Sequence, residues 1–218
     1  MLKALRWTPQ RPIIRADQRD EAAIERWRFE VWPDLYKRAG KEGRTIVFVD
    51  ESGFYLLPGV VRTYAPLGQG TVLRSTKTRD HLSAMCGITP EGNMYTIVRE
   101  NALSSDDAVL FLMHLFEHVP DRLLIVWDGS PIHRGEVREL LRQGASRHIH
   151  LEALPPYAPD LNPVECAWHY LKSVELRNVC CHSMSELRLE LTLAIRRLRS
   201  KPWIVRSFFE EAKLVMSM

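Results

Sequence analysis

The sequence predicts an α/β fold in which one mixed sheet is flanked by helices. Short apolar runs rich in β-branched and aromatic residues alternate with segments of helical periodicity, in the order strand, hairpin, helix, strand, helix, strand, helix. The chain has 218 residues, of which 45% are hydrophobic and 26% charged. A chain of this length and composition can bury one well-filled core.

The composition also limits the classes of protein to be considered. No apolar run approaches the ~20 residues that a membrane helix needs, and the N-terminus lacks the apolar region of a secretory signal. The four cysteines form no CxxC pair, so we expect a reduced, cytosolic compartment. The net charge of +3 permits a polyanionic partner but does not require one.

The first half of the chain predicts a helix, a buried strand and a hairpin. Residues 20–36 carry apolar side chains at helical spacing, although Pro33 is expected to interrupt the end. The apolar run at 46–49 predicts a strand that is buried on both faces. Residues 56–70 read as loop and short strand. The runs 81–88 and 94–98 then flank the turn TPEGN of a hairpin.

The second half predicts alternating helices and strands. A helix begins after Ser104, where Asp107 completes a capping pattern, and ends before Pro120. The remaining elements are a strand at 123–127, a helix closed by Gly144, a strand at 148–154, a helix from Pro163 and two C-terminal helices at about 183–200 and after Pro202.

The stretch LPPYAPDLNPVECAW, residues 154–168, stiffens the chain with four prolines ahead of a helix. One interpretation is structural: Asn162 caps the helix, Pro163 takes its first position, and Glu165 closes a capping box. The other interpretation is that the stretch positions the carboxylate of Glu165 for a functional site. On the helix, Glu165 shares a polar face with Lys172, whereas Trp168 belongs to an apolar face.

Two further carboxylates end the two most apolar strands, Asp50 after IVFV and Asp128 after LLIVW. Aspartate often follows a strand because it favours turns. If the strands are parallel neighbours, however, both carboxylates emerge at the edge where open α/β sheets bind ligands. Together with Glu165 they would form an all-oxygen cluster suited to Mg²⁺ or Mn²⁺. Two such ions ~3.5–4 Å apart serve phosphodiester chemistry.

The segments VFVDES, VWDGSPIHR and LPPYAPDLNPVECAW closely resemble the three motifs of the mariner-type DDE transposases, in the branch found in bacterial insertion sequences. The resemblance spans residues 44–175, and its last motif is the most specific. It implies an RNase H-like fold whose acidic triad maps onto Asp50, Asp128 and Glu165. In that family, the first of these bridges two metal ions, the second holds one ion and the third holds the other.

The resemblance implies metal-dependent DNA strand cleavage at transposon ends, followed by strand transfer into target DNA. The partners would be transposon-end and target DNA and a second copy of the chain, in the bacterial cytoplasm at the nucleoid. Gly129 stands where many relatives carry Asn, a position that is not a metal ligand. The family normally begins with helix-turn-helix modules, which we expect this chain to be too short to hold.

Residues 1–43 are accordingly predicted to be a helical linker segment, and residues 44–218 a catalytic domain with C-terminal helices. A separately encoded helix-turn-helix protein is a candidate partner. The alternative function is a catalytically silent DNA-binding or regulatory remnant of a transposase. A haloacid dehalogenase-type phosphohydrolase is disfavoured, because that class expects a second Asp where Ser52 stands.

Other polar residues have two interpretations each. Strand alternation points Glu51 away from Asp50, which favours a structural role. His133, at a helix start, could contact phosphate or be an ordinary polar residue. His114 and His118 have zinc-like spacing without an evident third ligand, so exposed surface is expected. Two groups of basic residues could contact the phosphates of a nucleic acid or could form an ordinary solvent-exposed face. The first group is Arg134, Arg138 and Arg142, and the second is Arg196, Arg197, Arg199 and Lys201.

Overall fold

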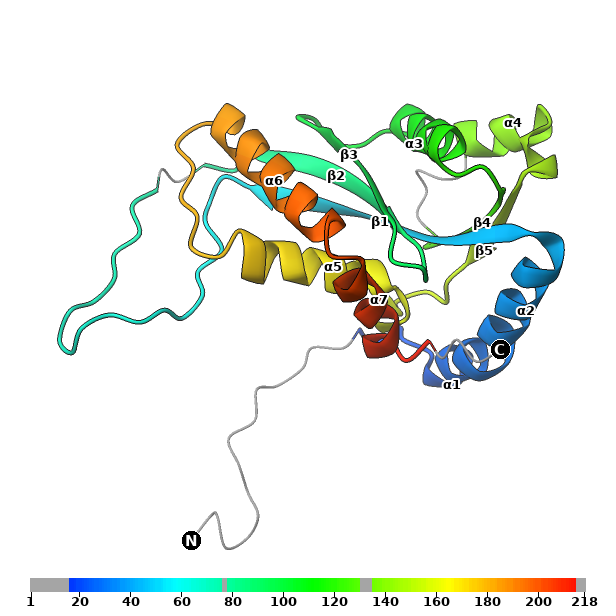
Figure 1. The fold of residues 1–218 in the computed structure, drawn as a ribbon, viewed down its shortest axis with the longest axis horizontal. Coiled ribbons are helices and arrows are strands. Elements are labelled where there is room, and N and C mark those ends of the chain that lie inside the picture. Colours follow the sequence, from blue (N-terminus) through cyan, green and yellow to red (C-terminus); the bar gives the residue numbers. More distant parts are fainter. Residues whose placement is uncertain (1–15, 76–77, 130–134, 215–218) are drawn as a thin grey trace, which may run out of the picture.

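The computed structural model describes residues 16–75, 78–129 and 135–214 (Figure 1). Its single sheet has five strands in the order β3-β2-β1-β4-β5. The strands β1, β2 and β3 are antiparallel neighbours, whereas β1, β4 and β5 run parallel, so the predicted mixed sheet is confirmed. Their bounds are β1 (Arg44–Tyr55), β2 (His81–Ile88), β3 (Met94–Arg99), β4 (Arg122–Trp127) and β5 (Ile149–Ala153).

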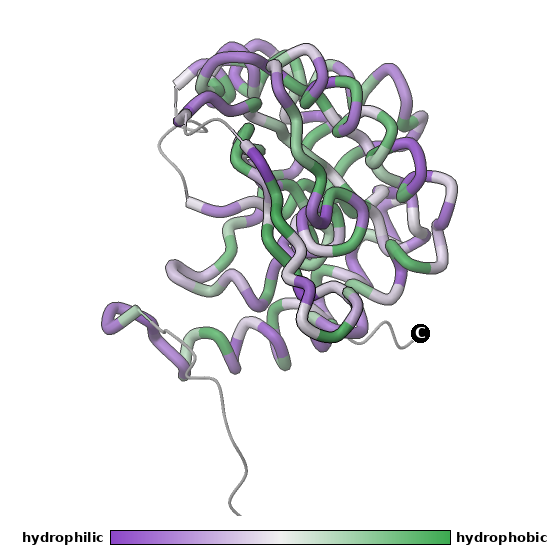
Figure 2. Tube along the Cα trace, turned by 90° about the vertical axis from the view of Figure 1, so that its left-hand side faces the viewer, coloured by the Kyte–Doolittle hydropathy of each residue, from purple (hydrophilic) through white to green (hydrophobic). Residues whose placement is uncertain are grey.

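Helices cover both faces of this sheet (Figure 1). One face packs against α1 (Glu21–Arg26), α2 (Trp32–Glu42), α5 (Pro163–Tyr170), α6 (Met184–Arg199) and α7 (Pro202–Glu211). The other face packs against α3 (Ser105–His118) and α4 (Glu136–Arg142). Hydrophobic stretches accordingly run through the middle of the molecule, with many hydrophilic ones on its outer turns (Figure 2).

The central strand β1 is buried on both faces, as its continuous apolar run predicts. Its side chains alternate between the two cores: Phe48 belongs to the core under the larger group of helices, and Val47 and Val49 to the core under α3. All three side chains are fully buried. β4 pairs with the first half of β1, up to Phe48, and β2 pairs with the second half, from Phe48 to Tyr55, so each half of the strand has a hydrogen-bonded neighbour.

The N-terminal helix passes through Pro33, contrary to the expected interruption. A π turn at Trp27–Val31 joins α1 to α2, and the Trp32 backbone N–H donates to the Trp27 carbonyl oxygen. Pro33 therefore lies in the first turn of α2, where a missing N–H is tolerated. The helix ends at Gly43, whose φ of +61° is left-handed, as is common after a helix.

The N-terminal helix shares its core with the sheet. Trp27 stacks on Trp32 with ring centroids 6.2 Å apart, and the ring of Trp32 lies 5.4 Å from that of Phe48 on β1. Residues 20–43 therefore have no core separate from the sheet, and the division into a linker segment (1–43) and a catalytic domain (44–218) stays a prediction.

The segment 56–80, here called the β1–β2 loop, extends away from the body of the molecule (Figure 1). The short strand expected in it is absent from its described residues. Its base is closed by the Leu56 N–H, which donates to the Asp80 carbonyl, and by Asn178, which bonds the backbone of Val61 and Gly59. Among the described residues, no helix is long and apolar enough to cross a membrane.

The hairpin between β2 and β3 is formed as predicted and touches the start of α7. Gly92, in its turn, has a φ of +96° and donates its N–H to the Thr89 carbonyl. A Cβ atom added at this position would collide with the backbone carbonyl of Pro202. The turn therefore needs glycine both for its left-handed conformation and for the close approach.

We expect Gly92→Ala to lower the thermal midpoint clearly more than Gly68→Ala does. Both positions have positive φ, but a Cβ at Gly68 meets nothing within 4 Å, so that variant carries only the left-handed strain of about 1–2 kcal/mol. Thermal unfolding followed by circular dichroism measures the difference. Equal losses in the two variants would contradict the contact with Pro202.

Candidate active site

Asp50 and Asp128 lie at the same edge of the sheet. Strands β1 and β4 are parallel neighbours whose register pairs Phe48 with Val126, so the two aspartates follow two residues beyond a matched pair. Contrary to the expectation, β1 does not end at Asp50 but continues past it to Tyr55, because these residues still pair with β2. Both line one cavity of about 610 Å³, together with Glu165 and the segment Leu154–Pro159. The prediction that these strands are adjacent and that their carboxylates share a cleft is confirmed.

Asn162 fixes the start of the helix that carries Glu165. Its Oδ1 accepts from the Val164 N–H at 3.2 Å, and its Nδ2 donates to the Val49 carbonyl at 3.1 Å. Its backbone N–H donates to Pro159 rather than to Glu165, so the capping-box interpretation of Glu165 is wrong. The buried Asn162 side chain instead ties the first turn of α5 to the middle of β1, one residue before Asp50.

The electrostatics of the cavity resist three ionised carboxylates. Burial, together with the charges of Glu165 and Glu51, raises the pKa of Asp50 to about 8, against a hydrogen bond from Trp168 Nε1 at 2.9 Å. Desolvation also raises the pKa of Glu165, with Lys172 lowering it and Asp128 raising it. Among the described residues, no protein group donates a hydrogen bond to the Glu165 carboxylate. A cation would relieve this repulsion.

Lys172 brings a positive charge to the same region. Its Nζ donates to Ser52 Oγ at 2.7 Å and lies 5.2 Å from the centroid of the Phe54 ring. Desolvation lowers its pKa, whereas Glu165 and Asp50 raise it. The helical face that it shares with Glu165 was visible in the sequence, but the contact with β1 was not, because the two residues are 120 positions apart.

The remaining sequence candidates fall into three groups. Glu51 accepts from Trp127 Nε1 at 3.0 Å, in keeping with a structural role on the opposite side of β1 from Asp50. His133 and Arg134 lie outside the described residues. The basic groups are partly neutralised within the chain, because Arg197 and Lys201 both pair with Glu175 and Arg142 pairs with Glu139.

His118 is exposed and His114 is half-buried, in agreement with the surface position expected for this pair, but a third potential ligand lies within reach. Glu117 lies beside them on α3, and one donor atom of each of the three residues lies within 4.8 Å of the others. In the described part of the chain no other group of three His, Cys, Asp or Glu residues meets that spacing.

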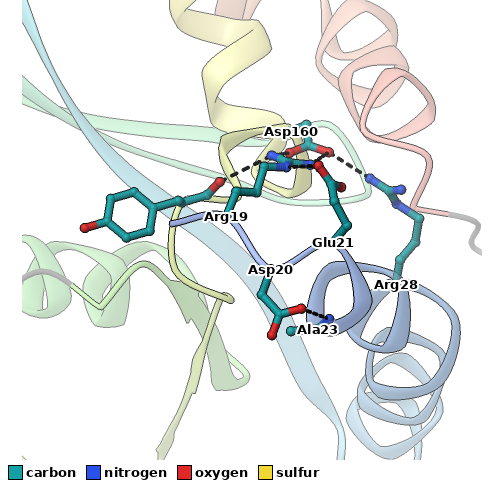
Figure 3. Close-up of polar contacts among 7 residues, drawn as sticks. Arg19, Asp20, Glu21, Ala23, Arg28 and Asp160 are labelled. Carbon is teal, nitrogen blue, oxygen red and sulfur yellow. Dashed lines mark hydrogen bonds and ion pairs between the residues drawn. The ribbon is translucent and has the colours of Figure 1, made fainter. Parts of the chain in front are cut away.

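A group of ionised side chains that the sequence did not reveal holds the wall of this cavity (Figure 3). Arg19 and Arg28, near the N-terminus, both donate to the carboxylate of Asp160. Asp160 lies in the Pro-rich stretch between β5 and α5. These contacts span 132 to 141 positions, so no local pattern could have predicted them.

We expect Asp50→Asn to stabilise the metal-free protein at pH 8. A carboxyl whose folded-state pKa is raised from about 4 to about 8 binds a proton more tightly when folded, so its contribution to stability is lost as pH rises through that window. The variant should melt at least about 2–4 °C higher at pH 8, the shift that about 1 kcal/mol produces in a chain of this size.

The same comparison at pH 4 is the control, because both side chains are then largely neutral. Addition of Mg²⁺ at pH 8 should raise the melting temperature of the wild type but not that of Asp50→Asn. A variant that melts below the wild type at pH 8 without metal would show that the buried charge is already compensated inside the protein.

Comparison with protein families agrees with this geometry. The model of the DDE superfamily endonucleases matches residues 45–188, and the model of the winged helix-turn-helix domains matches residues 1–31. No curated protein matches the chain. The expectation that this chain holds no helix-turn-helix sequence is therefore wrong. The charged, helical composition of that segment resembles that of an ordinary linker, and no short motif marks it.

Solved structures share the fold at low identity. The mariner Mos1 transposase paired-end complex with Mg matches with a TM-score of 0.67 and 17% identity, covering 97% of this chain and 66% of that chain. The Mos1 paired-end complex with the left transposon end gives 0.63 and 15%, with coverage of 97% and 69%. The Mos1 catalytic domain gives 0.53 and 12%, with coverage of 94% and 100%.

These likenesses confirm the RNase H-like fold, a five-stranded mixed sheet flanked by helices. The assignment to the bacterial insertion-sequence branch stays a prediction. The endonuclease model covers about two thirds of the chain, including Asp50 on β1, Asp128 directly after β4 and the helix that carries Glu165. The chain therefore belongs to the DDE superfamily endonucleases.

Proposed function

We propose that this protein is a transposase catalytic domain that cleaves DNA strands and transfers them to a target with two Mg²⁺ or Mn²⁺ ions. The observation that carries the proposal is the convergence of Asp50, Asp128 and Glu165 on one cavity at the carboxyl edge of β1 and β4. Solved Mos1 paired-end complexes with Mg and with Mn support the choice of metal by their likeness in fold.

The chemistry of the donors fits hard divalent cations. The three side chains offer only carboxylate oxygens, which Mg²⁺ and Mn²⁺ prefer. Burial and mutual repulsion raise the pKa of Asp50 and Glu165, and bound cations would remove that penalty. When bound, a pair of such ions activates the attacking oxygen and stabilises the leaving oxygen of a phosphodiester.

The neighbouring side chains hold this site in shape. Trp168 donates to Asp50 Oδ2 and so fixes which way that carboxylate faces. The hydrogen bond from Asn162 to the Val49 carbonyl fixes the position of the helical turn that carries Glu165 relative to β1. Lys172 carries a charge beside the cavity and is suited to contact a DNA phosphate. Each residue acts on position or charge, which is the main protein contribution in phosphoryl transfer.

The partners follow from this function. We infer that the chain binds transposon-end and target DNA, and that residues 1–31 contribute to end recognition through their match to winged helix-turn-helix domains. A separately encoded helix-turn-helix protein would then be an additional partner rather than a necessary one. The bacterial cytoplasm, at the nucleoid, is the compartment that suits a DNA-acting protein with free cysteines.

A homodimer is supported by the β1–β2 loop. Its apolar side chains Tyr64 and Leu67 are fully exposed, and Val60 and Val72 are more than 70% exposed. Large apolar side chains gathered on one projecting segment favour burial against a partner surface. A second copy of the chain is the partner that a paired-end reaction requires.

We expect Glu165→Gln to abolish strand cleavage in Mg²⁺ or Mn²⁺ while the metal-free protein melts at or above the wild-type temperature. Glutamine keeps the size of the side chain but removes the charge that holds a hard cation. Cleavage of a labelled transposon-end duplex, resolved on a denaturing gel, measures the loss. Glu186→Gln, at the start of α6, is the matched control and should cleave normally.

Cleavage that persists in Glu165→Gln would exclude this residue as a ligand. A wild type that binds DNA but does not cleave it under any divalent metal would instead favour the silent regulatory remnant. The two outcomes are distinct, because the first leaves the reaction intact and the second removes it.

We expect Lys172→Met to weaken binding to duplex DNA by a similar factor for every sequence and to reduce the slope of log K against log salt by about one. Each phosphate contact releases about one counterion, and this contact reads no base. A salt series of fluorescence anisotropy titrations measures the slope. Lys41→Met, at the end of α2, is the control, and an unchanged slope for Lys172→Met would exclude the contact.

A further inference from the structure

The carboxylate of Asp160 is held by two arginines from the N-terminal segment; we call these three residues the Asp160 clamp (Figure 3). Arg19 donates to both oxygens, from Nη1 to Oδ1 at 2.6 Å and from Nη2 to Oδ2 at 3.0 Å. Arg28 Nη2 adds a bond to Oδ2 at 3.1 Å. Two parallel charge-assisted bonds from one guanidinium fix orientation as well as distance.

The clamp is shielded on its arginine side. The side chains of Arg19 and Arg28 are only 11% and 15% exposed, against 45% for Asp160. Hydrogen bonding by Arg19 lowers the pKa of Asp160, so the pair stays ionised near neutral pH. An exposed ion pair would contribute little, but a partly buried bidentate pair holds its geometry.

The segment that the clamp holds is the wall of the acidic cavity. Arg19 Nη1 also donates to the Tyr157 carbonyl at 3.3 Å, and Tyr157 has a φ of +56°, an unfavourable left-handed conformation for a residue with a Cβ. Tyr157 and Pro159 line the cavity, and Asp160 lies in the 3₁₀ turn Pro159–Leu161 just before Asn162. The clamp thus fixes the chain path that leads into α5.

We propose that the Asp160 clamp is a positioning device through which the N-terminal segment sets the placement of Glu165. Both arginines lie within residues 1–31, which match the winged helix-turn-helix model, so the segment assigned to DNA recognition and the wall of the cavity share one ionic contact. The proposal rests on the proposed function. Arg19, Arg28 and Asp160 are positioning residues: they touch neither metal nor DNA and act through the loop.

The coupling has a direct physical consequence. The clamp holds the Pro-rich wall in one position, so its loss would let the wall, and with it the start of α5, move. Displacement of a catalytic carboxylate by about 1 Å costs up to about 100-fold in rate. Loss of the clamp should therefore lower turnover while leaving DNA affinity nearly unchanged.

The test compares Arg19→Gln, Asp160→Asn and the double variant in the full chain. Arg188→Gln, which removes the exposed pair with Glu100, is the matched control. We expect each single variant to reduce the cleavage rate constant at saturating DNA about tenfold or more, with DNA Kd within about twofold of the wild type. The double variant should be slowed by clearly less than the product of the two single losses, because both single variants remove the Arg19–Asp160 pair.

Amide hydrogen exchange of residues 154–162 gives a readout independent of activity. Exchange there should be faster in both single variants and unchanged in Arg188→Gln. Unchanged exchange and turnover in both would overturn the proposal, as would losses that add in the double variant or a fall in DNA affinity as large as the fall in rate. If the wild type does not cleave, the proposed function fails, and exchange alone still decides whether the clamp holds the wall.

A separate observation points to a transition-metal site on α3. His114, Glu117 and His118 follow at i, i+3 and i+4, on one face of the helix, with donor atoms within 4.8 Å of one another. His118 Nδ1 lies 2.8 Å from the His114 carbonyl oxygen. A carbonyl only accepts, so Nδ1 carries the proton and the Nε2 lone pair is free for a metal.

We infer that these three residues bind a late first-row cation such as Zn²⁺ or Co²⁺, whose preference for imidazole separates this site from the all-carboxylate cavity. Titration with Co²⁺, followed by visible absorption, should give one equivalent on the wild type. His114→Gln and His118→Gln should each weaken binding about tenfold or more. His182→Gln is the control and should bind like the wild type. Equal loss in the control, or no loss in the first two variants, would show adventitious binding only.

Discussion

The parallel pairing of β1 with β4 is the constraint on which the rest of the structure depends. It brings Asp50 and Asp128, which are 78 positions apart, to one edge of the sheet, and it requires the crossover through the β2–β3 hairpin and α3. Both strands are buried on both faces, so the pairing cannot shift without exposing the core. The third carboxylate is then added from outside the sheet by α5, which Asn162 fastens to the same strand.

The site that results is a balance between repulsion and fixed geometry. Three carboxylates face one cavity, and burial makes the ionised form of Asp50 unfavourable near neutral pH. Trp168 and Lys172 offset part of this cost from the helix that also carries Glu165. Stability of the metal-free protein is thereby lowered at the place where cations would bind, a common compromise at functional sites.

The N-terminal segment belongs to this balance. Trp27 and Trp32 pack against Phe48 on β1, while Arg19 and Arg28 hold the Pro-rich wall through Asp160. The N-terminal segment therefore packs on the sheet through its helix and holds the wall of the cavity through Arg19 and Arg28 (Figure 3). A segment matching a DNA-recognition domain is thus in direct contact with the part of the chain that leads to Glu165.

The sequence alone predicted the mixed sheet, most of its elements and the three acidic residues that share the cavity, because apolar periodicity, caps and short motifs are local features. The interruption predicted at Pro33 was wrong, because the packing of Trp27 and Trp32 on the sheet stabilises the π turn that accommodates this proline. The tertiary structure decided the remaining features. Glu165 does not close a capping box, because the Asn162 N–H donates to the Pro159 carbonyl instead. Lys172 reaches Ser52 only because the fold brings the continuation of α5 beside β1. The Asp160 clamp also depends on the tertiary structure. Ion pairs between residues more than 130 positions apart leave no local pattern, because only the fold makes them neighbours.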